Sequence, residues 1–227
     1  MRLNSWKYAL LVVAAAAMPA CDIKDPLENV DIRLDIKDAP IQFSGNEGSV
    51  AVSTEQAGIT TASVSMDSDI EEVADLQTIH LDPADFTFTS TAGVVASGNF
   101  ASLVQASGAV RLGILVSGIP VPGFPLTVSI VNNVVTDIDP DSISFSDAVY
   151  KKEQFEAMIN ALPESQRPNL PSNWDNLTVA QAKQLIEDEL GKAGFDISII
   201  VDVISGDLNG TLTLGEFTVD AEVVTGT

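Results

Sequence analysis

The chain has 227 residues with 32 acidic and 11 basic side chains, which gives a formal net charge of −21 at pH 7. A surface of that sign repels phosphate backbones, so the composition argues against nucleic-acid binding. The length is enough for one sizeable domain or two small ones. Hydrophobic residues make up 45% of the chain and the mean hydropathy is +0.22, which is high for so acidic a chain.

The first twenty residues have the layout of a secretory signal peptide. Arg2 and Lys7 form a basic start without acidic residues, and an apolar run from Tyr8 to Met18 follows. That run is too short to span a bilayer as the helix of a mature protein. We therefore expect residues 1–20 to direct export and to be removed.

The four residues MPAC at the end of this segment resemble the lipobox of bacterial lipoproteins. Met18 and Ala20 match the pattern, whereas Pro19 departs from the usual small residue. The resemblance implies that Cys21, the only cysteine, is lipidated and anchors the chain in the inner or outer membrane of a bacterial cell envelope. The two or three acyl chains of such lipoproteins would hold it durably. The alternatives are an ordinary cleaved signal peptide with an incidental cysteine, and an uncleaved anchor.

After the anchor, residues 21–29 are predicted to form a polar tether and residues 30–227 a single β-rich domain. Alternating apolar and polar residues, bounded by Gly, Pro, Asn and Asp, are typical of short antiparallel strands. Asn132 and Asn133 suit a tight hairpin turn, because asparagine tolerates positive φ. The expected fold is mainly β, an antiparallel sandwich or barrel-like domain. The runs lie at 30–36, 49–53, 60–66, 78–82, 86–90, 92–98, 109–117, 126–138, 195–205 and 210–224.

The pattern becomes helical between about residues 146 and 191, where we expect a two-helix insertion that caps the β domain. The first helix is predicted from Ser146 to Leu162. The second begins after Thr178, which starts a capping box, and ends near Gly191. Another capping-box pattern predicts a short helix at 68–77.

The insertion is also the candidate face for a protein partner or the membrane surface. It holds Lys151, Lys152, Arg167, Lys183 and Lys192 in a chain with few basic residues. The simpler interpretation is that amphipathic helices need polar side chains on their outer face.

Three carboxylates beside a proline turn, Asp137, Asp139 and Asp141, form the candidate metal site. Calcium binds six to eight oxygen ligands, and closely spaced carboxylates on a loop supply some of them. The alternative is that aspartate favours turns because its side chain bonds nearby backbone amides. Calcium is the only cofactor that the sequence suggests.

A second acidic segment, SGDLNGTLTLGEF at 205–217, partly matches an EF-hand loop. Asp207, Asn209 and Glu216 stand at ligand positions, but Ser205 occupies the first position, where the motif has aspartate. Both flanks alternate as strands, whereas an EF-hand loop joins two helices. We therefore expect a β-hairpin with a glycine-containing turn.

His80 is the only histidine, and it stands two residues before Asp82. A His–Asp pair with a serine would suit a hydrolase, but no nucleophile elbow or zinc-binding histidine motif accompanies it. Beyond the signal segment, Trp174 and Tyr150 are the only tryptophan and tyrosine. Sugar-binding clefts usually stack rings on such side chains, so carbohydrate binding is disfavoured.

These observations predict a lipid-anchored binding or structural module of the cell envelope without catalytic activity. Its partners would be the membrane, through Cys21, and a protein at the helical segment. The alternative function is a carrier of a lipid or another apolar ligand, held in a β-domain cavity with the helical segment as its lid. A hydrolase that uses His80 or a pair of carboxylates is the third hypothesis.

Overall fold

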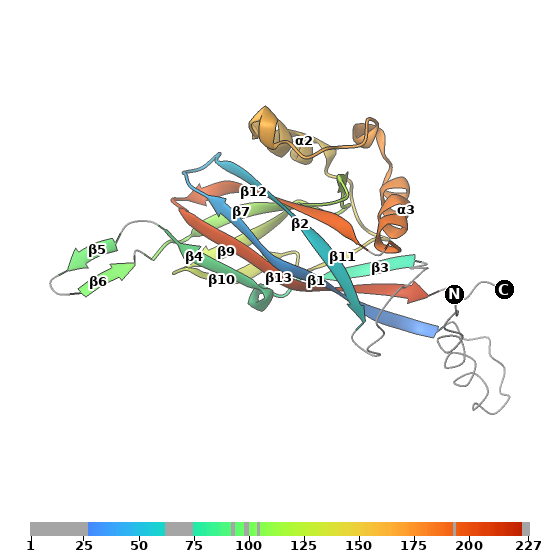
Figure 1. The fold of residues 1–227 in the computed structure, drawn as a ribbon, viewed down its shortest axis with the longest axis horizontal. Coiled ribbons are helices and arrows are strands. Elements are labelled where there is room, and N and C mark those ends of the chain that lie inside the picture. The colour runs from blue at the N-terminus through green and yellow to red at the C-terminus, as the bar shows by residue number, and fades with distance from the viewer. Residues whose placement is uncertain are drawn as a thin grey trace, which may run out of the picture.

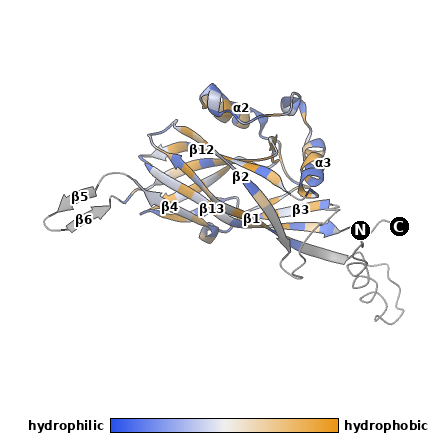
Figure 2. Ribbon diagram, in the orientation of Figure 1, coloured by the Kyte–Doolittle hydropathy of each residue, from blue (hydrophilic) through white to orange (hydrophobic). Residues whose placement is uncertain are grey.

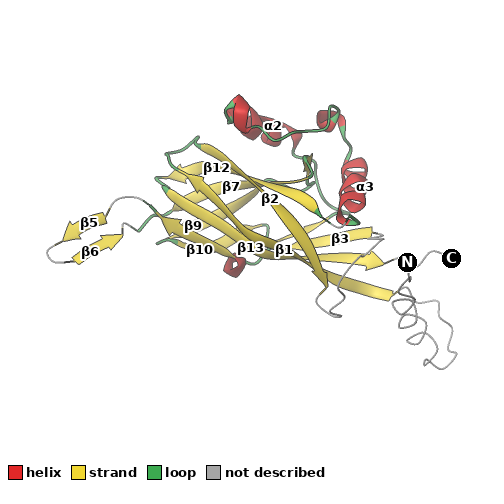
Figure 3. Ribbon diagram, viewed as in Figure 1, coloured by secondary structure: helices red, strands yellow, loops and turns green. Residues whose placement is uncertain are grey.

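In the part of the chain that the structure describes, the protein is mainly β, with thirteen strands and with two helices in one insertion, as predicted (Figures 1 and 3). A computed structural model describes residues 27–61, 75–91, 94–97, 100–103, 105–192 and 194–223. The strands are β1 (Leu27–Phe43), β2 (Val50–Thr61), β3 (Asp75–His80), β4 (Phe86–Ser90), β5 (Val94–Ser97), β6 (Phe100–Leu103), β7 (Gly108–Val116), β8 (Ile119–Pro120), β9 (Leu126–Val131), β10 (Val134–Asp139), β11 (Ser142–Ser144), β12 (Phe195–Gly206) and β13 (Gly210–Val223). The helical elements are α2 (Lys152–Ala161), α3 (Val179–Leu190) and the short 3₁₀ turns η1 (Pro83–Asp85), η2 (Glu164–Gln166) and η3 (Trp174–Asn176).

The main sheet has the strand order β10-β9-β7-β12-β2-β1-β13-β3-β11, with β4 beside β13 and β8 beside β7. β1 pairs with β2 only over residues 32–36, whereas its pairing with β13 continues to Phe43. The sheet therefore divides beyond this short ladder into two layers, which enclose the core as in a sandwich.

Burial along the strands shows which faces are covered. β4 and β9 alternate between buried and more exposed residues, as expected for strands with one face on the core. In β12, however, Ile197–Val201 are all buried. The reason is that α2 covers the outer face of this layer: a Cβ atom added to Gly113 of β7 would lie 2.9 Å from the ring of Phe155 in α2. Figure 2 shows the mixed hydropathy of both helices.

The first predicted helix is shorter than expected, because α2 begins at Lys152 and not at Ser146. Val149, which falls within the predicted range, lies outside the helix with a relative exposure of 66%. The Val149 carbonyl instead accepts a hydrogen bond from the Gly123 N–H, and Lys151 Nζ donates to the carbonyl of Pro125 at 2.9 Å. The segment before α2 is thus tied to the loop between β8 and β9.

The second helix is confirmed, with the predicted capping box at its start. Thr178 Oγ1 accepts a hydrogen bond from the Gln181 N–H, and the Gln181 side chain accepts one from the Thr178 N–H. The helix ends at Leu190, and Gly191 donates its N–H to the Glu187 carbonyl.

The short helix predicted at 68–77 is wrong where it can be compared, since residues 75–77 belong to β3. The remainder of that prediction, and the strand predicted beyond residue 61, lie outside the described residues.

The two predicted hairpins had different outcomes. Asn132 and Asn133 join β9 to β10 with φ of 53° and 68°, which confirms the tight turn. By contrast, β12 and β13 do not pair with each other: β12 lies between β7 and β2, and β13 lies between β1 and the strands β3 and β4. The segment around Asp207 therefore crosses from one layer to the other.

β5 and β6 form a separate two-stranded sheet. Figure 1 shows this pair, which we call the arm, extending away from the main sheet. β1 begins and β13 ends at the opposite end of the molecule (Figure 1). The arm and the start of the described chain are thus at opposite ends of the long axis.

Candidate functional site: the junction beneath α3

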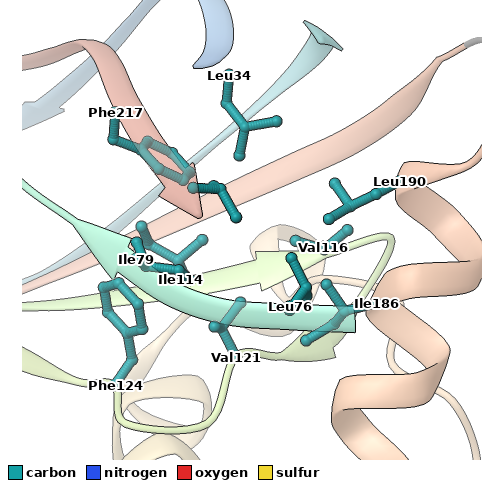
Figure 4. A pocket seen from close by; sticks show the side chains of 11 residues that line it. Leu34, Leu76, Ile79, Ile114, Val116, Val121, Phe124, Ile186, Leu190 and Phe217 are labelled. Atoms are coloured by element: carbon teal, nitrogen blue, oxygen red, sulfur yellow. The ribbon is translucent and has the colours of Figure 1, made fainter. Parts of the chain in front are cut away.

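Helix α3 covers one end of the sandwich, where it contacts β3 and β8. Ile186 and Leu190 on its inner face meet apolar side chains from both layers around a small cavity (Figure 4). The remaining lining residues are Leu34, Leu76, Ile79, Ile114, Val116, Val121, Phe124, Phe217 and Val219.

The cavity has a volume of about 20 Å³. That is room for about one water molecule, and an apolar lining offers water no hydrogen-bond partners. A ligand pocket typically has several hundred Å³. For an apolar ligand to enter here, α3 would have to move away from the sheet.

A buried carboxylate fixes α3 to the sheet beside this cavity. Glu187 has a relative exposure of 6%, and its Oε1 accepts a hydrogen bond from the Leu76 N–H at 2.8 Å. β11 pairs only with residues 78–80 of β3, so Leu76 lies beyond the end of that ladder. The Glu187 carboxylate therefore satisfies an edge N–H that β11 does not reach.

Lys183 completes the cluster from the previous turn of α3. Its Nζ lies 3.8 Å from Glu187 Oε1, forms an ion pair with Asp75 and sits 5.9 Å from the ring centroid of Phe145. Burial raises the pKa of Glu187, while the Leu76 N–H and Lys183 counteract part of that rise. The cluster thus contains an ionisable group whose charge is costly to bury but is paired on two sides.

A second cluster lies on the outer face of β1, β13 and β3. His80 Nε2 is 2.8 Å from Asp220 Oδ2, and the histidine side chain is 50% exposed. The pKa of Asp31, which stands opposite Asp220 in the ladder, is raised chiefly by a hydrogen bond between the two carboxyl groups. Asp82, the acid considered from the sequence, caps η1 by accepting a hydrogen bond from the Ala84 N–H.

The structure does not gather the predicted calcium ligands. Asp137, Asp139 and Asp141 are all exposed, the first two in β10 and the third just after it. Across the described ranges of the chain, no group of three or more His, Cys, Asp or Glu side chains is close enough to hold a metal ion. Cys21, the predicted lipidation site, lies outside the described residues.

The EF-hand-like segment has strands and not helices on both sides, but it connects β12 to β13 without forming the predicted hairpin. Within it, the Asn209 amide donates to the Asp207 carboxylate, and Glu216 lies 3.5 Å from Arg33. These contacts engage two of its acidic groups within the domain.

The basic residues of the insertion also contact this chain itself. Arg167 donates to the carbonyls of Leu162 and Asn160. Lys152 lies 3.9 Å from Asp175, and Lys192 pairs with Glu189. A protein partner at the helical segment therefore stays a prediction.

Sequence reasoning missed Glu187, Asp220 and Asp31. Glu187 stands next to Ile186 in a helix otherwise read by its apolar residues, and its partner Leu76 is 111 positions away. Asp220 and Asp31 belong to strands whose register only the folded sheet defines. Alternation identified the strands that contain the last two, but it gave no indication that they meet.

Comparison with known protein families, curated proteins and solved structures finds no match to this chain. None of the helices in the described part of the chain is long and apolar enough to cross a membrane.

Proposed function

We propose that the protein is a lipid-anchored module of the bacterial cell envelope that acts in binding or structure and not in catalysis. The observation that carries this proposal is the arrangement of the two ends: the chain enters the domain at the end opposite the arm (Figure 1). The lipobox-like MPAC segment supplies the anchor in this proposal.

The tether limits how far the domain can lie from the membrane. Five residues lie between Cys21 and Leu27, the first residue of β1, so six Cα–Cα steps connect the two. At about 3.5 Å per residue they span at most about 20 Å. A lipid on Cys21 would therefore keep the start of β1 close to the membrane surface.

The strand register then sets the distance to the arm. β1 has 17 residues, which extend about 50 Å at about 3.3 Å per residue. Its last residue, Phe43, pairs with Gly210, and Gly210 pairs with Ser90 at the end of β4, just before the arm. The root of the arm is thus about one strand length from the anchored end.

The packed junction beneath α3 supports a module with a filled core over a carrier. A cavity of about 20 Å³ holds no lipid, so the carrier alternative requires α3 to swing outward. A native mass spectrum of the purified protein would show added mass if it carries a lipid or another apolar ligand.

The proposal is tested by expressing the full chain in a bacterium beside a Cys21→Ser variant. We expect the wild type in the membrane fraction, with an intact mass that lacks residues 1–20 and includes acyl chains. The variant should lose the acyl mass and leave the membrane fraction. A wild type that is processed without lipid, or that stays in the soluble fraction, would contradict the anchor.

A further inference from the structure

We propose that the arm is a self-association element that pairs, edge to edge, with the arm of a second copy of this chain. The two β5–β6 hairpins would then form one four-stranded sheet. This inference rests on the proposed function only in assuming that the arm is held away from the membrane.

The sequence around the arm carries no charge. Residues 86–110 contain no Asp, Glu, Lys, Arg or His, although 19% of the chain is charged and about five charges would be expected in 25 residues. Residues 112–136 are also free of charge, but they run through β7, β8 and β9 and are largely buried. The arm lies away from the main sheet (Figure 1), so a place in the core of the sandwich does not account for its composition.

Among the described strands, β5 and β6 pair only with each other. An isolated two-stranded hairpin is only marginally stable in water. Natural proteins protect exposed strand edges with charges, prolines or a covering element. Residues 86–110 contain neither charge nor proline, so their sequence lacks these protecting residues.

The uncharged surface continues onto the domain at the root of the arm. A shallow groove of about 380 Å³ lies there, and none of its lining residues carries a charge. These residues are Gln42, Phe43, Ser44, Thr91, Gly210 and Thr211. A second arm could therefore approach this end without meeting carboxylates in the groove.

Electrostatics favours a second copy at the arms over contact elsewhere on the domain. Each chain carries a net charge of −21, so two copies repel each other wherever their acidic surfaces meet. Contact through uncharged arms that project from the domains keeps these surfaces apart. Two identical hairpins related by a two-fold axis also form a closed, self-complementary interface.

The test is sedimentation velocity of residues 22–227, which contain every element that the structure describes. Val95 and Ser102 are opposite each other in the β5–β6 ladder, so Val95→Lys with Ser102→Glu adds a charge pair that the hairpin tolerates. The Lys–Glu pair leaves the net charge unchanged and places one charge on each strand of the arm, which disfavours edge-to-edge pairing. The matched control, Val149→Lys with Ser146→Glu, makes the same changes at two exposed positions before α2.

We expect the wild type and the control to form dimers as concentration rises, and more strongly in added salt, which screens the repulsion between domains. The arm variant should dimerise about tenfold more weakly or not at all, with an unchanged thermal unfolding curve. Replacing residues 92–104 with a short Gly-Ser link should also give a monomer, which covers the case of a misfolded hairpin variant.

A wild type that stays monomeric at all concentrations and salt levels would overturn the inference and leave a different protein as the candidate partner of the arm. An arm variant that dimerises as tightly as the wild type, or a dimer that salt weakens, would also overturn it. None of these results bears on lipidation, which the mass and location of the full chain test separately.

Discussion

Glu187 in α3 accepts a hydrogen bond from the backbone N–H of Leu76 in β3 at 2.8 Å. The carboxylate occupies the place of a neighbouring strand at a point where β11 has already ended. One side chain therefore both satisfies the edge of the sheet and fixes the helix over the apolar cavity. We therefore expect substitutions of Glu187 to change the stability of the protein according to whether they keep a hydrogen-bond acceptor for Leu76.

Glu187→Ala is expected to destabilise the protein by about 1–3 kcal/mol, because it leaves the buried Leu76 N–H without an acceptor. Glu187→Gln keeps an acceptor oxygen and removes the costly buried charge, while Lys183 retains its contact with Asp75. We therefore expect the Gln variant to be about as stable as the wild type at pH 7. Urea unfolding of both variants measures the difference, and equal losses would contradict the role of the hydrogen bond.

The pH dependence of Glu187 has a defined sign. Burial raises its pKa in the folded state above the value in the unfolded chain. Its contribution to stability is therefore fully present below the ordinary glutamate pKa and is lost as pH rises through the raised pKa. Across that window the wild type should lose stability relative to Glu187→Gln, as measured by urea unfolding at a series of pH values. A constant difference between the two proteins would show that the pKa of Glu187 is not raised.

Gly113→Ala tests the packing of α2 on β7. The added Cβ would lie 2.9 Å from Cε1 of Phe155, whose side chain is fully buried, so overpacking should cost about 1–3 kcal/mol. When Phe155→Leu is added, the double variant should lose less stability than the sum of the losses in the two single variants. Gly194→Ala is the control, because its Cβ would meet no atom within 4 Å. Thermal unfolding of the wild type, the three single variants and the double variant decides the prediction.

Leu190→Ala tests the apolar packing around the small cavity beneath α3. Removing most of a side chain that lines the cavity of about 20 Å³ should destabilise the protein by about 2–5 kcal/mol. The enlarged apolar space should then bind benzene, which would raise the melting temperature of the variant but not of the wild type. Gln184→Ala, at an exposed position of the same helix, should change stability by no more than about 0.5 kcal/mol. A similar response to benzene in the wild type would mean that the junction opens unaided.

Asp31→Asn tests the carboxyl pair on the outer face of the sheet. The hydrogen bond to Asp220 raises the pKa of Asp31, so the stabilising contribution of protonated Asp31 is lost as pH rises above the ordinary aspartate pKa. The Asn variant should therefore gain stability relative to the wild type in that direction, by less than about 1 kcal/mol because the site is exposed. Measurements at low and neutral pH test this sign, and a relative loss at neutral pH would contradict it.

Local signals in the sequence predicted the elements that depend on nearby residues. The Thr178 capping box and the Asn132-Asn133 turn were confirmed because each involves groups only a few residues apart. The predicted start of the first helix was wrong, because the Val149 carbonyl accepts a hydrogen bond from the Gly123 N–H. Helical periodicity does not encode that contact.

Pairing partners could not be predicted in the same way. Alternation identified β12 and β13 as strands, but their closeness in sequence suggested a hairpin that does not form. β13 pairs instead with β1, which is far away in the sequence, and Phe43 lies opposite Gly210. The candidate site could not be predicted for the same reason, since Glu187 and Leu76 are far apart in the sequence and meet only when the sheet and the insertion have both folded.

The long antiparallel ladder of β1 and β13 has a mechanical consequence. A pull between a membrane anchor near Leu27 and a load on the arm would pass from Ser90 through β13 into β1, along the direction of the strands. Hydrogen bonds in an antiparallel ladder lie perpendicular to the strands. Such tension would shear many of them together and would not open them one at a time, so the ladder would resist a pull between these two ends.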